Sequence, residues 1–102
     1  MLELRPNCEH CARALPPDSE EAMICSFECT FCQACVEQVL LNVCPNCGGG
    51  FQTRPVRPAN AWRPGLSVRD YPPVAEGVHK PVDTDQHVEF AAPIKNTPPA
   101  RR

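Results

Sequence analysis

Eight cysteines are the residues of this sequence best suited to chemistry. All of them lie between Cys8 and Cys47, so one residue in five of that stretch is a thiol. A CxxC pair lets two thiolates converge on one ion about 2.3 Å away, while backbone amides of the turn point at the sulfurs. The four closely spaced pairs, with no cysteine left over, predict two sites of four thiolates each. The full spacing is Cys8-x2-Cys11-x13-Cys25-x3-Cys29-x2-Cys32-x2-Cys35-x8-Cys44-x2-Cys47.

Disulfides are the alternative use of so many thiols. Disulfide-dense small domains are secreted, and secretion normally requires a signal peptide. The chain opens Met-Leu-Glu-Leu-Arg-Pro-Asn-Cys, which has neither a basic region nor an apolar stretch. No apolar run approaches the ~20 residues of a membrane-spanning helix. We therefore expect a cytosolic (cytoplasmic) protein that does not span a membrane, in which clustered cysteines bind metal.

Zinc is the expected metal, with two ions per chain. The Cys-Pro-x-Cys-Gly run at Cys44–Gly48 also resembles one knuckle of a rubredoxin iron site, so iron remains an alternative. A catalytic zinc keeps one position open, whereas eight thiolates close both sites. We therefore expect structural zinc and no enzymatic activity. His10 is expected to face solvent or to shield a zinc–sulfur bond, and His79 and His87 are expected to be solvated.

The elements that position these thiols are short. Residues 23–26 and 29–31 are rich in apolar and β-prone side chains and predict a hairpin, whereas residues 33–42 contain good helix formers at helical spacing. Asn42 can end that helix, and Pro45 cannot continue it. Glycine after the last thiol suits a tight turn with positive φ.

The apolar residues before residue 54 can form only a small core. Phe27 and Phe31 lie four residues apart, so as strand residues they face the same side and are expected in the core. The apolar side chains before residue 54 are nevertheless too few to offset the entropy of ordering the backbone. A cross-link is therefore required, and the thiols supply it.

The eight-ligand spacing resembles the RING-type cross-brace signature, with cysteine at the fourth ligand where many members carry histidine. Spacing alone also permits sequential sites, but in the RING family the first and third ligand pairs share one zinc and the second and fourth share the other. The resemblance implies a small metal-stabilised α+β fold, a RING-like treble clef with two zinc sites, one β-hairpin and one short helix. It implies a first site of Cys8, Cys11, Cys32 and Cys35, and a second of Cys25, Cys29, Cys44 and Cys47.

Longer stretches resemble a family of small bacterial Cys-rich proteins known only as a domain of unknown function. The similar stretches are the opening eight residues, Leu-Pro-Pro-Asp, Ile-Cys-Ser-Phe-Glu-Cys-Thr-Phe-Cys and Cys-Pro-Asn-Cys-Gly-Gly, within residues 1 to about 55. This likeness implies a fold but no activity. RING ubiquitin ligases usually place an apolar residue after the first ligand and a basic one after the last. Glu9 and Gly48 stand there in this sequence, so ligase activity ranks third among its functions.

Composition divides the chain into a module, residues 1–54, and a Pro-rich extension, residues 55–102. Nine of the thirteen prolines lie in the extension, which predicts an extended or disordered tail. The module has a formal charge of −4, and two four-thiolate zinc sites would bring it near −8. Such a surface repels phosphate, so no specific nucleic-acid partner is expected. Arg54, Arg57 and Arg63 form a basic strip that lies against the acidic module or stays solvated.

The sequence thus favours a non-enzymatic zinc-binding module that mediates protein–protein interaction, with a basic protein as partner. Trp62, the only indole, either anchors a partner or folds back onto the module. The alternative function is a thiol-based redox or metal-responsive switch, in which oxidation ejects zinc.

Overall fold

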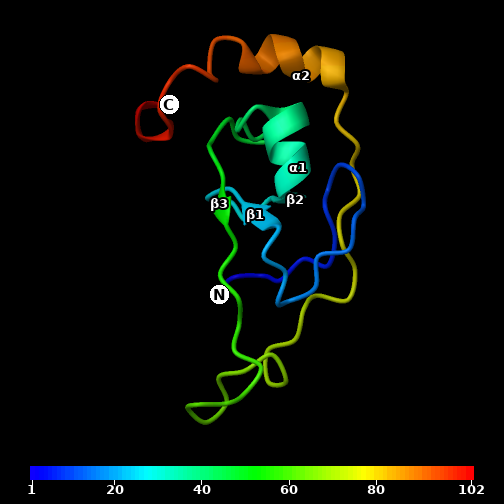
Figure 1. Ribbon diagram of the computed structural model, residues 1–102, viewed down its shortest axis with the longest axis vertical. Coiled ribbons are helices and arrows are strands. Elements are labelled where there is room, and N and C mark those ends of the chain that lie inside the picture. The colour runs from blue at the N-terminus through cyan, green and yellow to red at the C-terminus, as the bar shows by residue number, and fades with distance from the viewer.

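A small antiparallel sheet and a short helical segment form the centre of the fold (Figure 1). The computed structural model describes residues 1–102, which span 46 × 27 × 18 Å. The sheet order is β2-β1-β3. The strands are β1 (Ala22–Ile24), β2 (Thr30–Cys32) and β3 (Gln52–Thr53).

The predicted hairpin is present, with slightly shifted ends. β1 pairs with β2 in a register that sets Met23 opposite Phe31. The turn closes through a hydrogen bond from the Cys25 amide to the Cys29 carbonyl at 3.1 Å. Phe31 is fully buried, as expected, but the prediction for Phe27 is wrong, because this side chain is 72% exposed. Phe27 lies in the turn, next to a residue with φ of 66°, so strand alternation does not apply to it.

The predicted helix over residues 33–42 is also present, in two parts. α1 (Gln33–Cys35) continues directly into a π-helical turn, η1 (Val36–Leu40). The backbone then turns left-handed at Leu41 (φ 57°) and Asn42 (φ 56°), which ends the helix. The Asn42 side chain accepts a hydrogen bond from the Phe51 amide at 3.0 Å and so fixes the chain that returns towards β3.

The core lies between this helical segment and the sheet. Phe31 and Phe51 meet edge to face, with ring centroids 5.5 Å apart and planes at 80°. Leu15 and Leu40 are fully buried in the same cluster, which also contains six of the eight cysteines. The sulfurs are therefore part of the core, and the apolar packing is continuous with the thiol clusters.

The structure does not show residues 55–102 as the extended or disordered tail that the composition predicts. They leave β3, make a loop at one end of the molecule, and return along the N-terminal loop to end beyond α2 (Thr84–Ala91) and a 3₁₀ turn, η2 (Pro99–Arg101) (Figure 1). Packing is tight, because a side chain at Gly77 would collide with Asn7, whose amide donates to the Val78 carbonyl at 2.9 Å. Hydrogen bonds between backbone groups and between side chains and the backbone, which composition does not reveal, hold the segment in place. Whether residues 1–54 and 55–102 are separate domains stays a prediction.

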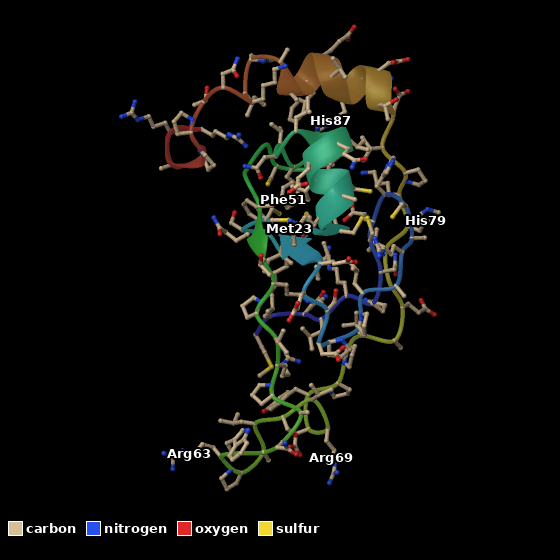
Figure 2. All side chains as sticks on the ribbon, viewed as in Figure 1. Met23, Phe51, Arg63, Arg69, His79 and His87 are labelled. Atoms are coloured by element: carbon tan, nitrogen blue, oxygen red, sulfur yellow. The ribbon has the colours of Figure 1, made fainter.

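α2 is attached to the module through His87. Its Nε2 donates to the Leu40 carbonyl at 2.8 Å, and the residue is only 3% exposed. Figure 2 shows His87 between α2 and the helical segment below it, while His79 lies at the side of the molecule. The expectation of a solvated side chain is therefore wrong for His87, whereas His79 is exposed. His87 satisfies a carbonyl at the end of a helix, a role that leaves no trace in sequence spacing.

The two histidines provide a matched test of this attachment. His87→Ala removes a buried hydrogen bond and leaves the Leu40 carbonyl with the Val43 amide as its other donor, so we expect a loss of about 0.5–1.5 kcal/mol in the free energy of unfolding. His79→Ala, at an exposed position, is expected to change it by less than about 0.5 kcal/mol. Urea unfolding of both variants measures the difference. Equal stability of the two would show that the His87 contact is not a net stabilising one.

The loop between β3 and the returning segment projects from the far end of the molecule. The Val68 amide closes it by donating to the Pro58 carbonyl at 2.9 Å. Trp62 is 82% exposed, so it does not fold back onto the module. Arg63 points outward near the tip of this loop (Figure 2). None of the helices in the structure has the length and apolar character needed to cross a membrane.

Candidate metal centres

The first thiol cluster joins the N-terminal loop to the junction of β2 and α1. The sulfurs of its four cysteines all lie within 4.8 Å of one another. The Cys11 and Cys32 sulfurs are 3.8 Å apart, which is about the separation of two sulfurs that occupy corners of a tetrahedron around zinc. The cluster consists of Cys8, Cys11, Cys32 and Cys35. The structure therefore groups the four residues that the RING resemblance assigns to the first site.

The second cluster lies between the hairpin turn and the loop after η1. The sulfurs of Cys25, Cys44 and Cys47 lie within 4.8 Å of one another, and Cys29 falls outside that mutual spacing. Cys29 nevertheless belongs to the same neighbourhood, because Cys25 and Cys44 both affect its pKa. Its sulfur also accepts a hydrogen bond from the Asn46 side chain at 3.4 Å. The structure thus groups the first pair with the third and brings Cys25 of the second pair to the fourth, whereas the place of Cys29 in the second site stays a prediction.

Tight backbone turns hold both CxxC pairs. In the last pair, the Gly48 amide donates to the Cys44 carbonyl at 2.7 Å, and Gly48 has the predicted positive φ, 78°. The first pair has the same arrangement, with the Ala12 amide donating to the Cys8 carbonyl at 2.9 Å. Ala12 has a φ of 64° there, although it is not glycine. The two turns therefore share one backbone conformation, which lets the two sulfurs of each CxxC pair approach the same metal ion.

Amide groups point at the cysteine sulfurs. The Phe27 amide donates to the Cys25 sulfur at 3.3 Å, and the Gly49 amide donates to the Cys47 sulfur at 3.4 Å. Such hydrogen bonds stabilise a thiolate and leave its remaining lone pairs for a metal. A thiol pair that only packed in a core would not require donors aimed at sulfur.

Burial governs the protonation of most of these thiols. Burial raises the pKa of Cys29, Cys32, Cys35 and Cys44, and neighbouring cysteines add to the effect. Cys11 differs: burial acts to raise its pKa, but hydrogen bonds from the Arg13 backbone and the three other thiols of its cluster lower it. Four thiolates so close together repel one another unless a cation lies between them. A divalent ion supplies that charge and displaces the protons.

The donor set fits a soft, tetrahedral metal ion. Thiolate-only clusters select zinc or iron over the hard cations, which prefer oxygen ligands. Cys11 and Cys47 are exposed, whereas the other cysteines are buried. Each cluster therefore has one thiol at the surface, through which an ion can enter, and the two clusters can hold metal ions.

Residues beside the cysteines have roles that the sequence did not reveal. His10 does not face solvent freely, because its Nδ1 accepts a hydrogen bond from the Val82 amide at 2.8 Å, whereas shielding of a zinc–sulfur bond by its ring stays a prediction. Glu9 is 5% exposed, and its Oε1 accepts from the Asn46 side chain at 2.9 Å. The Lys80 amide donates to the Glu9 carbonyl at 2.8 Å. The C-terminal segment thus binds directly to the loop of the first CxxC pair.

Comparison with known proteins finds a family that includes the cysteine-bearing part of the chain. Residues 1–57 match the model of a family described as "Protein of unknown function (DUF1272)". An uncharacterized protein of Rhizobium meliloti (strain 1021) is 56% identical over 81 residues, which cover 79% of this chain and 89% of the relative. That stretch is longer than the family match, so the likeness continues into the C-terminal segment. No solved structure matches the chain.

Proposed function

Because the chain belongs to the DUF1272 family, whose function is unknown, we propose its function from the site itself: a non-enzymatic zinc-binding module that mediates protein–protein interaction. Each centre holds one zinc ion through four thiolates. The assignment of a Cys-rich family of unknown function agrees with the expectation from the sequence. The interleaved grouping of the thiols is the observation that carries the proposal.

Closed four-thiolate coordination argues for a structural role of the metal. Zinc with four protein ligands has no position for water or substrate, so it neither activates a nucleophile nor polarises a carbonyl. The ion instead fixes the two CxxC turns relative to the hairpin and the helical segment. The product of this arrangement is a rigid surface and not a reaction centre.

The charge of that surface favours a basic partner. Residues 1–54 carry three arginines and seven acidic residues, and each four-thiolate zinc site adds two further negative charges. Arg54 is buried and Arg57 is half-buried, so neither offsets the negative charge at the surface. Electrostatic complementarity steers association and suppresses partners of the same sign.

Native mass spectrometry with elemental analysis tests the metal assignment on protein purified without added metal. We expect two zinc ions per chain and eight cysteines that react with a thiol reagent only after a chelator is added. Iron, a single ion or four disulfides would contradict the proposal. Pulldown of zinc-loaded protein should then recover a saturable basic partner that salt releases.

A redox or metal-responsive switch is the second candidate, and the exposure of Cys11 and Cys47 favours it. Thiolates at the surface are the ones that oxidants reach. Mild peroxide separates the two functions: a switch releases zinc at concentrations well below those that oxidise free cysteine, and a structural module does not. Ubiquitin-ligase activity ranks third, because Glu9 is buried at the position where such ligases present an apolar residue.

A further inference from the structure

A groove of about 460 Å³ separates α2 from the loops that carry the cysteines. It exists only because the C-terminal segment folds back, so it has no counterpart in the sequence pattern. No cysteine lines it, and it is therefore distinct from both metal centres. We call it the α2 groove; its polar and aromatic lining residues are Glu9, Asn46, Lys80, Asp83, Gln86, His87 and Phe90.

Hydrogen-bond acceptors dominate the polar lining of the α2 groove. Glu9 is only 5% exposed; its Oε1 accepts from Asn46, and its Oε2 lies 3.9 Å from an Arg5 guanidinium nitrogen. A carboxylate offers about four acceptor positions, so capacity remains. His87 donates through Nε2 to the Leu40 carbonyl, and in the tautomer that makes this bond Nδ1 is an acceptor. Asp83 uses Oδ1 to cap α2 at the Gln86 amide, 3.0 Å away.

The charge and the walls of the groove favour a cation. The carboxylates of Glu9 and Asp83 line the groove, and the amine of Lys80 is the single positive charge beside them. Lys80 is exposed, and its long side chain is flexible. Phe90 is 43% exposed, and its ring faces a groove in which a guanidinium can stack. The acidic module below adds a negative field. An anion would meet Glu9 and Asp83 instead, so the groove discriminates by sign.

We propose that the α2 groove receives a positively charged side chain, an arginine or a lysine, from a basic protein partner. The proposal deepens the proposed function and rests on it for the identity of the partner as a protein. The buried Glu9 carboxylate provides the charge, Asp83 and His87 provide further acceptors, and Phe90 provides the stacking face.

Amide-resolved NMR titration of the zinc-loaded full chain tests this site. The probes are acetyl-Gly-Arg-Gly-amide, agmatine as a free amine, and acetyl-Gly-Glu-Gly-amide as the matched acidic peptide. We expect saturable shifts at Asn46, Gln86 and Phe90 with the arginine peptide and none with the acidic one. Saturation by agmatine without binding of the arginine peptide would overturn the assignment to a protein partner.

Matched variants separate the groove from general electrostatics. Glu9→Gln removes one charge with little change of shape, and Asp83→Asn does so while keeping an N-cap. Each is expected to weaken binding of the arginine peptide by about tenfold, since a charge-assisted hydrogen bond is lost. Glu20→Gln, at an exposed acid outside the groove, removes the same charge and should leave binding within about twofold. Equal weakening by all three variants would overturn the proposal.

Zinc content measured on the same samples keeps the two proposals apart. Two zinc ions per chain without saturable binding of the arginine peptide would overturn the groove and leave the metal assignment intact. Saturable binding by a folded chain that holds no zinc would overturn the metal assignment and leave the groove.

Discussion

Removing the metal with a strong chelator under reducing conditions is expected to unfold residues 1–54. The strands there have three, three and two residues, and α1 with η1 has eight, which is too short for independent stability. Six cysteines belong to the buried cluster, so ions bound there would join most parts of the core. Binding of a structural zinc contributes about 10–16 kcal/mol, which exceeds the net stability of most small domains.

The dispersion of amide NMR signals measures this loss, and re-addition of zinc should restore the native spectrum. Cys35→Ser and Cys44→Ser, one from each cluster, are each expected to lower the metal content and to destabilise the whole module, because the clusters interleave along the chain. Ser26→Ala changes an exposed neighbour of Cys25 and serves as control. A chelated chain that keeps native dispersion would refute the claim that metal holds the fold together.

The cysteine pattern predicted what depends on local spacing. A CxxC turn, a hairpin and a helix that ends at left-handed residues are each specified by a few neighbouring side chains, and all are present. The structure groups four cysteines of the first site and three of the second that the RING resemblance implies. Phe27 shows the limit of this reasoning, because it lies in the turn between the two strands, where strand alternation does not determine which side a side chain faces.

The return of residues 55–102 could not be predicted in the same way. Each hydrogen bond that holds the segment to the module uses at least one backbone group, such as the Val74 amide on the Leu4 carbonyl at 3.1 Å, and every non-proline residue offers these groups. A high proline content favours an extended backbone, but an extended chain can lie on a surface as well as in solvent. The contact of His87 with Leu40 and the α2 groove both form only when this segment packs against the module. They could therefore not be predicted from the sequence either.

Besides the cysteines, the fold depends on Arg54. From the sequence, this residue is expected in a basic strip that lies against the module or stays solvated. It is 1% exposed, and its guanidinium donates to the carbonyls of Arg5, Leu15 and Pro16 at 2.9, 3.2 and 2.9 Å. Burial, and next the charge of Arg57, lower its pKa, but a guanidinium remains protonated. One side chain thus connects the end of β3 to two parts of the N-terminal loop.

Arg54→Met is expected to lower the free energy of unfolding by about 3–5 kcal/mol. Methionine fills similar apolar space, but the Arg5 and Leu15 carbonyls lose the guanidinium as donor in a largely buried place. The Pro16 carbonyl keeps only the Ser19 amide. Arg54→Lys keeps the charge without the planar fork and should recover only part of the loss. Arg63→Ala, at an exposed position of the projecting loop, should have an effect below about 0.5 kcal/mol. Urea unfolding of the zinc-loaded variants measures all three, and wild-type stability of Arg54→Met would show that desolvation of the cation cancels its hydrogen bonds.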